Sequence, residues 1–155
     1  MNPLIQQNHN HHQCIHDALS AAETTCRIKG LRMTPLRHQA LELIWASHTP
    51  VKAYDLLDRL KELDFNSAPP TVYRALDFLL GAGLVHRIES LNAYIGCNHP
   101  QTDHNAQFLI CDHCHSVAEM DASHINAALR REANSCGFRI QSPTIEIHGV
   151  CQSCR

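Results

Sequence analysis

The 155-residue sequence predicts an α+β protein, in which an N-terminal winged helix-turn-helix is followed by a small α/β domain. Helical spacing of apolar residues dominates the first half and ends in two short strand patterns, whereas the second half alternates strand patterns with one helix. We expect a disordered His-rich tail over 1–14, a first domain over 15–97, a hinge over 98–105 and a second domain over 106–155.

The helices of the first half are predicted from their apolar spacing and from the residues at their ends. Four are expected, over about 15–28, 34–47, 52–64 and 70–80. Gly30 ends the first helix, and Gly81 and Gly83 end the fourth. The pair Thr34-Pro35 predicts the start of the second, because threonine caps helices and proline suits their first turn.

The fourth helix has an apolar face and a polar face. The residues spaced to face the core are Val72, Leu76, Leu79 and Leu80. The residues left toward solvent or a ligand are Thr71, Tyr73, Arg74 and Asp77. Two short strands over 84–89 and 93–97 follow and complete a winged helix-turn-helix. The alternative is a small helical bundle with an added hairpin.

The second half predicts a β-β-α-β unit. Its strands are expected over 107–111, 117–120 and 139–149, and its helix over 123–135. Within that helix, Ile125, Leu129 and Ala133 have the spacing of a buried face. A unit of about fifty residues usually needs a metal, disulfides or a partner subunit to be stable.

Eight cysteines and thirteen histidines set this composition apart. No run approaches the roughly 18 apolar residues of a membrane helix, and the N-terminus lacks a signal-peptide core, so we expect a cytoplasmic location. In a reducing compartment cysteines serve as metal ligands or redox groups, which favours metal binding over disulfides.

The net charge of −2 disfavours a constitutive nucleic-acid binder. Residues 1–90 carry nine basic and nine acidic side chains, and residues 91–155 carry four and six. Any affinity for DNA must therefore come from a local basic face, from dimerisation or from bound cations. The pattern mildly favours a metal-dependent binder.

Two Cys-x-x-Cys pairs, Cys111 with Cys114 and Cys151 with Cys154, predict a structural zinc site with four thiolate ligands. A thioredoxin-like redox site would need one such pair near a βαβ unit. A zinc deaminase would need His-x-Glu and a proline before the first cysteine, where this chain has Ile110.

A second group of metal-ligating residues lies between the predicted wing and the second domain. Its members are His86, Cys97, His99, His104 and Glu119. One thiolate, two imidazoles and a carboxylate would suit zinc better than iron or manganese. Scattered surface histidines and a buried free cysteine are the alternative, and the spacing alone leaves both open.

The order of several motifs resembles the ferric uptake regulator family. These are the runs 31–37 (LRMTPLR), 70–76 (PTVYRAL) and 83–86 (GLVH), followed by the two cysteine pairs. The resemblance covers about 15–154 and is strongest to the zinc uptake regulator branch. Iron and peroxide sensors of the family carry H-H-x-H where this chain has 105–108 (NAQF), and a histidine where it has Lys52. Both departures disfavour iron and leave nickel or manganese open.

The resemblance implies a homodimer that binds a palindromic DNA operator and represses zinc-uptake genes when zinc is plentiful. It implies two zinc ions per protomer, a structural one on the four paired cysteines and a regulatory one. The regulatory ligands would be His86, Cys97, His104 and Glu119.

The fourth helix would then enter the major groove, where the guanidinium of Arg74 can bond two acceptors of guanine. Tyr73 would contact a thymine methyl or a phosphate. The residues expected to position or contact the DNA backbone are Thr71, Arg37, Arg32 and Arg87.

A zinc enzyme and a zinc-binding interaction module are the two alternative classes of function. A zinc enzyme needs an open coordination position and a nearby general base, and the sequence shows no such acid–base pair, so we expect no enzyme. A zinc-binding interaction module that never contacts DNA stays open, because the first half carries no net charge.

Overall fold

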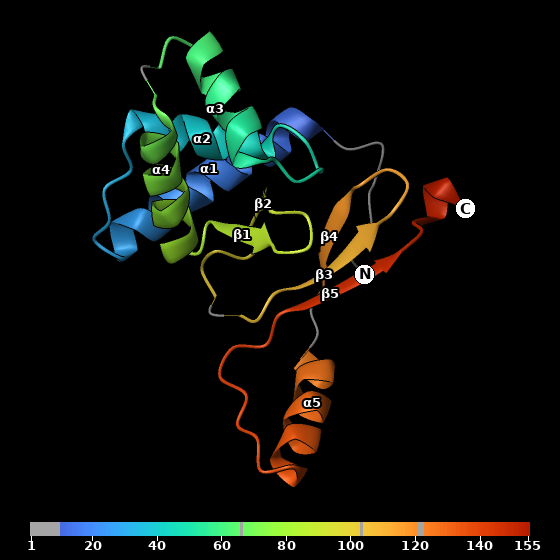
Figure 1. Ribbon diagram of the computed structural model, residues 1–155. Coiled ribbons are helices and arrows are strands. Elements are labelled where there is room, and N and C mark those ends of the chain that lie inside the picture. Colours follow the sequence, from blue (N-terminus) through green and yellow to red (C-terminus); the bar gives the residue numbers. More distant parts are fainter. Residues whose placement is uncertain (1–9, 66, 103, 121–122) are drawn as a thin grey trace.

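The computed structural model of the chain describes residues 10–65, 67–102, 104–120 and 123–155. Four helices make up the first half and are followed by a two-stranded hairpin (Figure 1). The helices are α1 (His11–Ile28), α2 (Pro35–Trp45), α3 (Ala53–Glu62) and α4 (Pro69–Gly81), and the strands are β1 (Val85–Ile88) and β2 (Ala93–Gly96). The predicted winged helix-turn-helix is confirmed.

The predicted disordered tail is wrong at its C-terminal end, because α1 already begins at His11. The side chain of Asn10 accepts the backbone N–H of Gln13 at 3.3 Å, and the Gln13 amide donates to Asp17 at 2.7 Å. A first turn whose polar groups are capped in this way needs no apolar face, so apolar spacing did not predict it. The rest of the predicted tail, residues 1–9, lies outside the described residues.

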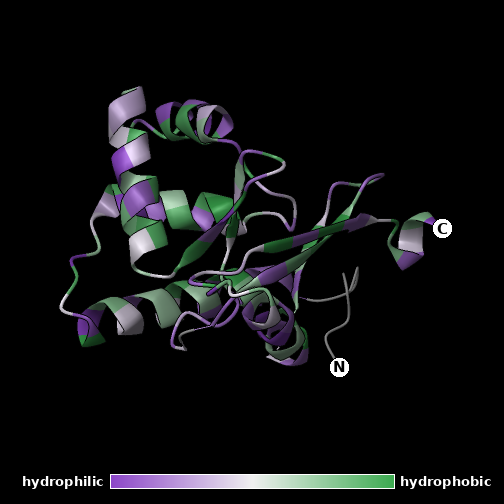
Figure 2. Cartoon of the chain, turned by 60° about the horizontal axis from the view of Figure 1, so that its bottom comes forward, coloured by the Kyte–Doolittle hydropathy of each residue, from purple (hydrophilic) through white to green (hydrophobic). Residues whose placement is uncertain are grey.

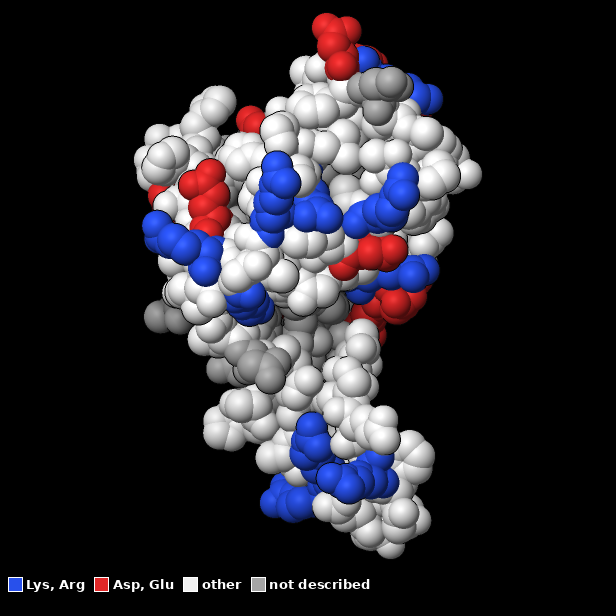
Figure 3. Space-filling model, turned by 90° about the vertical axis from the view of Figure 1, so that its left-hand side faces the viewer, with Lys and Arg blue, Asp and Glu red and all other residues white. Residues whose placement is uncertain are grey.

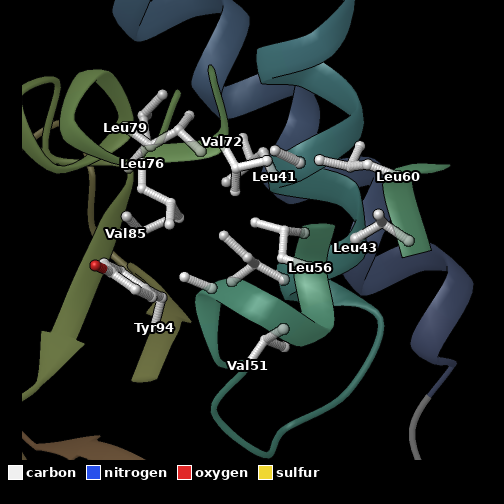
Figure 4. Packing of buried hydrophobic residues seen from close by; sticks show 14 of the residues in the cluster. Leu41, Leu43, Val51, Leu56, Leu60, Val72, Leu76, Leu79, Val85 and Tyr94 are labelled. Atoms are coloured by element: carbon white, nitrogen blue, oxygen red, sulfur yellow. The ribbon is translucent and has the colours of Figure 1, made fainter. Parts of the chain in front are cut away.

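The core of the first half is aliphatic and lies between the helices and the base of the hairpin. Figure 4 shows Leu41, Leu56, Leu60, Leu76 and Val85 pointing toward one another from four elements. The backbone of Val51, just before α3, exchanges two hydrogen bonds of 2.8 Å with Tyr94 of β2. The second strand of the hairpin is thereby fixed to the helices.

The second half forms a three-stranded sheet in the order β4-β3-β5. Its elements are β3 (Gln107–Cys111), β4 (Val117–Met120), α5 (Ser123–Ser135), β5 (Ile145–Gly149) and the 3-10 turn η1 (Gln152–Cys154). β4 is antiparallel to β3, and β5 is parallel to it, so α5 lies in the crossover. The last strand is shorter than the predicted 139–149, because the five residues of β3 give it partners only from Ile145 to Gly149.

The wing also packs on this sheet. Ile88 of β1 forms a second buried cluster with Phe108, Ile110 and Val117. In addition, the backbone N–H of Val117 donates to the carbonyl of His48 at 3.3 Å. The two halves are therefore in direct contact across the predicted hinge.

The helix α5 projects from the body of the molecule (Figure 1). None of its thirteen residues, all of them described, is buried, and Ile125 and Leu129 are 41% and 38% exposed. The prediction that the apolar face of this helix is buried is wrong for the single chain. Figure 2, in which the lower part of the molecule comes forward, shows hydrophobic and hydrophilic residues together on this helix. None of the helices in the described ranges is long and apolar enough to cross a membrane.

Candidate metal centres and nucleic-acid interface

The four paired cysteines come together at one end of the sheet. Cys111 ends β3, Cys114 lies in the turn that follows, Cys151 directly precedes the 3-10 turn and Cys154 ends it. Their sulfur atoms all lie within 4.8 Å of one another. Cys114 Sγ is 3.8 Å from Cys151 Sγ, which equals the edge of about 3.8 Å expected for a tetrahedron with Zn–S bonds of about 2.3 Å. We call these four residues the cysteine cluster.

The backbone of the cysteine cluster favours thiolates. The N–H of Cys151 donates to Cys111 Sγ at 3.4 Å. Hydrogen bonds from the Cys114 and Cys151 backbones lower the pKa of Cys111 to about 6. Contact with the sulfurs of Cys151 and Cys114 instead raises the pKa of Cys154, so the four protons are not held equally. The arrangement fits a soft divalent cation, because thiolates are the ligands that zinc takes in closed structural sites.

The second group converges from the wing, the predicted hinge and the sheet. His86 lies on β1, Cys97 directly follows β2, His104 lies in the predicted hinge and Glu119 lies on β4. One ligand atom of each lies within 4.8 Å of the others. We call these four residues the interdomain cluster.

The ligand atoms of the interdomain cluster lie close together. Glu119 Oε1 is 2.5 Å from Nε2 of His104 and 3.4 Å from Nε2 of His86. Cys97 Sγ is 3.6 Å from Nε2 of His104. One sulfur, two nitrogens and one oxygen thus face a common point, which is a donor set of the kind that zinc accepts.

Burial sets the charges of the interdomain cluster. Burial and the charge of Glu119 raise the pKa of the Cys97 thiol to about 12. Burial also raises the pKa of Glu119, but the nearby His86 imidazole and hydrogen bonds from the Asn98 amide and His104 outweigh it and lower that pKa to about 2. At neutral pH the cluster therefore holds a carboxylate beside a protonated thiol.

Two neighbours of this cluster were not predicted from the sequence. The backbone N–H of Asn98 donates to Oε2 of Glu119 at 3.1 Å and leaves Oε1 toward the histidines. A Cβ added to Gly96 would lie 2.2 Å from the ring of Trp45, so the indole lies flat against the residue before Cys97. The predicted fifth member, His99, lies beside the cluster, with its ring centroid 6.1 Å from that of His104.

The outer face of α4 is open to solvent. Tyr73 is 42% exposed, Arg74 is also exposed, and Thr71 is half-buried. A groove between the start of α2 and the start of α4 runs beside them. It is lined by Thr34, Leu36, Arg37, Thr71, Arg74 and Ala75. Figure 3 shows the side of the molecule on which α4 lies, where basic and acidic side chains are interspersed over the main body.

Two of the predicted DNA contacts, Arg37 and Arg87, also bind neighbouring residues within the chain. The guanidinium of Arg37 lies 3.7 Å from the ring centre of Phe78 and donates to the Arg32 carbonyl at 2.7 Å. It thereby joins the loop before α2 to α4. On the wing, Arg87 donates to Asn92 at 3.0 Å and lies 3.4 Å from the carboxylate of Glu89.

Comparison with known proteins adds to this geometry. The profile of the Ferric uptake regulator family matches residues 28–148. The chain belongs to this family. Its sequence is 40% identical over 139 residues to the Zinc uptake regulation protein of Escherichia coli (strain K12). These residues make up 89% of this chain and 81% of the relative. The predicted likeness to the zinc uptake regulators is thus confirmed.

Solved structures of relatives resemble the chain to different degrees. A zinc uptake regulator complexed with zinc and DNA matches with a TM-score of 0.84 at 40% identity, over 90% of this chain and 94% of the other. The holo form of XcZur matches with a TM-score of 0.80 at 47% identity, over 88% of this chain and 95% of the other. The apo form of XcZur matches with a TM-score of only 0.54 at 45% identity, over 90% of this chain and 97% of the other. The structure of this chain is thus similar to the holo and DNA-bound relatives as a whole.

Proposed function

We propose that this chain is a zinc-responsive transcriptional repressor whose homodimer binds a palindromic operator and controls zinc-uptake genes. The observation that carries this proposal is the interdomain cluster, whose ligands come from the wing, the hinge and the sheet. A relative named for zinc uptake regulation and a relative solved with zinc and DNA support it. A repressor of chromosomal genes acts in the cytoplasm, which we propose as its location.

We assign two zinc ions to each protomer. The cysteine cluster would hold a structural ion, because its four ligands leave no open position. The interdomain cluster would hold the regulatory ion. When bound there, zinc supplies bonds that join residues of both domains. The thiolate of Cys97 favours zinc over manganese, which prefers oxygen ligands.

The homodimer is supported by the surface of the second domain. Several of its large apolar residues are exposed in the single chain: Ile125, Leu129, Phe138, Ile147 and Val150. A domain this small gains stability when such a face is covered by a partner subunit. Two-fold symmetry would also place one α4 on each half of a palindrome.

The DNA contacts follow from the exposed face of α4. Arg74 and Tyr73 would reach base edges, and Thr71 would contact the backbone from the same helix. Arg32, Arg37 and Arg87 would add phosphate contacts from the loop before α2 and from the wing. For Arg37 and Arg87, this role uses the N–H groups that are not bonded within the chain.

The mechanism rests on the angle between the domains. His86 and Cys97 lie at the base of the wing, and Glu119 lies on the sheet of the second domain, where we place the partner subunit. By binding one zinc ion together, these residues would set the angle between the two domains. If the metal-free dimer adopted the binding geometry about 1% of the time, fixing that geometry would tighten DNA binding about 100-fold.

The decisive experiment is selection from a random duplex library, with zinc supplied or removed by a chelator mild enough to spare the cysteine cluster. We expect a palindromic motif to be enriched only with zinc, and Arg74→Ala to lose sequence preference at a cost of about 1–3 kcal/mol. Enrichment without zinc would contradict a regulatory role for the interdomain cluster. If no motif is enriched in either condition, the interaction module replaces the repressor. Nickel and manganese arms test the choice of metal.

A further inference from the structure

The tip of the wing is bound to the strand β5 by a carboxylate. Glu146 accepts the backbone N–H of Glu89 on Oε1 at 2.6 Å and that of Ser90 on Oε2 at 3.0 Å. Each oxygen thus serves one of two consecutive amides in the turn between β1 and β2. Partial burial raises the pKa of Glu146, but hydrogen bonds from Ser90 and Glu89 and the charge of His148 lower it overall. The side chain is therefore a carboxylate at neutral pH.

A second side chain of β5 reaches the same turn. His148 lies two residues after Glu146 and so on the same face of the strand. Its Nε2 is 3.2 Å from Ser90 Oγ, and its Nδ1 is 2.9 Å from Asp112 Oδ1. Asp112 lies between two cysteines of the cysteine cluster, and its backbone N–H donates to the Gly149 carbonyl at 2.8 Å. The wing tip is thereby connected through β5 to the end of the sheet that carries the cysteine cluster.

These contacts lie at the opposite end of the wing from the interdomain cluster. His86 and Cys97 belong to the base of the hairpin, whereas Glu89 and Ser90 form its tip. The buried contact of Ile88 with the sheet lies between the two ends. The wing is thus attached to the second domain at both ends, once by metal ligands and once by hydrogen bonds that need no metal.

We propose that Glu146, assisted by His148, is a positioning residue that holds the wing in its DNA-binding orientation and so sets the zinc concentration at which the protein responds. This proposal rests on the proposed zinc-dependent binding of DNA. A contact that forms in only one arrangement of two domains favours that arrangement, and it acts in the same direction as any ligand that selects it. We call the pair Glu146 and His148 the wing latch.

The structure that contains the wing latch is, over the whole chain, more similar to two metal-loaded relatives than to a metal-free one. The TM-score is 0.84 against the zinc- and DNA-bound regulator and 0.80 against holo XcZur, but 0.54 against apo XcZur. Sequence identity is similar in the three cases, at 40%, 47% and 45%, so it does not explain the difference.

The test compares Glu146→Gln and Glu146→Ala with the parent protein. Glutamine keeps one acceptor oxygen without the charge, and alanine removes both acceptors. Glu62→Gln is the matched control, because it removes the same charge from an exposed position at the end of α3. Circular dichroism and thermal unfolding establish that each variant is folded, and hydrogen exchange of the Glu89 and Ser90 amides reports whether the latch is formed.

Two titrations then measure the coupling. The first follows binding of the selected duplex by fluorescence anisotropy at buffered free zinc. The second follows zinc binding without DNA by competition with a chelator. We expect Glu146→Ala to raise the zinc concentration for half-maximal DNA binding about tenfold and to weaken zinc binding without DNA by a similar factor. Glu146→Gln should shift both less, and Glu62→Gln neither.

Each other outcome is decisive. If zinc binding without DNA is unchanged in a folded Glu146→Ala variant, the wing latch does not favour the zinc-bound arrangement and the proposal is wrong. Tighter DNA binding by Glu146→Gln would also overturn it, because Glu146 would then compete with a phosphate for the wing amides. If the parent protein binds no DNA, the repressor function fails, while the zinc titration and amide exchange still test the latch.

Discussion

The cysteine cluster and the interdomain cluster each gather four metal ligands, but they are built in different ways. The cysteine cluster draws on one domain, and backbone amides favour its thiolates before any metal binds. The interdomain cluster draws on both domains, and it keeps a protonated thiol beside a carboxylate. Ligands from one domain can stabilise a fold, whereas ligands from two domains can control how the domains are arranged. Four experiments test this difference between the two clusters.

The largest effect is expected from Cys111→Ser. Structural zinc contributes an apparent free energy of about 10–16 kcal/mol to the folding of small zinc domains. Losing one thiolate should therefore unfold the second domain and abolish the dimer. Zinc content, circular dichroism and sedimentation velocity measure this. A variant that kept its zinc and its thermal stability would contradict a structural role for the cysteine cluster.

Cys97→Ser should have a smaller and different effect. The fold and the structural zinc should remain, because Cys97 contributes nothing to the cysteine cluster. DNA binding at a fixed zinc concentration should weaken by about 100-fold, if the metal selects an arrangement that is populated about 1% of the time. If this variant instead unfolds, the interdomain cluster is structural, and the two clusters do not differ in role.

Gly96→Ala tests how closely the base of the wing is packed. The new Cβ would meet the Trp45 ring at 2.2 Å, and overpacking of this kind costs about 1–3 kcal/mol. We expect weaker zinc binding at the interdomain cluster, with an unchanged cysteine cluster, as measured by chelator competition. Gly81→Ala is the control, because its Cβ would meet nothing within 4 Å. Equal effects of the two variants would argue against the packing explanation.

The smallest effect expected is the pH dependence of regulatory zinc binding. The ligand must be the Cys97 thiolate, yet the thiol has a pKa of about 12, so binding at pH 7 releases its proton. Glu119, with a pKa of about 2, releases none. Affinity should therefore rise about tenfold for each unit of pH through the Cys97 proton. Calorimetry in buffers of different ionisation enthalpy counts the protons, and Cys97→Ser should release one fewer.

The sequence predicted those parts of the molecule that local pattern determines. The strands β3 and β4 and the helix α5 occur where their patterns placed them, and Thr34 caps α2 as expected. The cysteine cluster was also predicted, because Cys-x-x-Cys spacing places two sulfurs in one turn. In these cases the determining contacts lie within a few residues of one another.

The parts that depend on distant contacts were harder to predict. Spacing alone left the interdomain cluster open, because its ligands are distributed over residues 86–119 and meet only when the wing packs on the sheet. Apolar spacing on α5 indicates a face to be covered, but it does not say that another molecule must cover it. The turn amides bound by Glu146 left no signal in the sequence, since any residue has a backbone N–H.

The packing of Trp45 on Gly96 gives the protein an intrinsic optical reporter. Trp45 is the single tryptophan of the chain, and the residue after Gly96 is Cys97. Indole emission responds to the polarity and quenching groups around the ring, so a change at the base of the wing alters it. The cysteine cluster lies on another element and has no indole beside it. Emission from the unlabelled protein can therefore follow the interdomain cluster in real time.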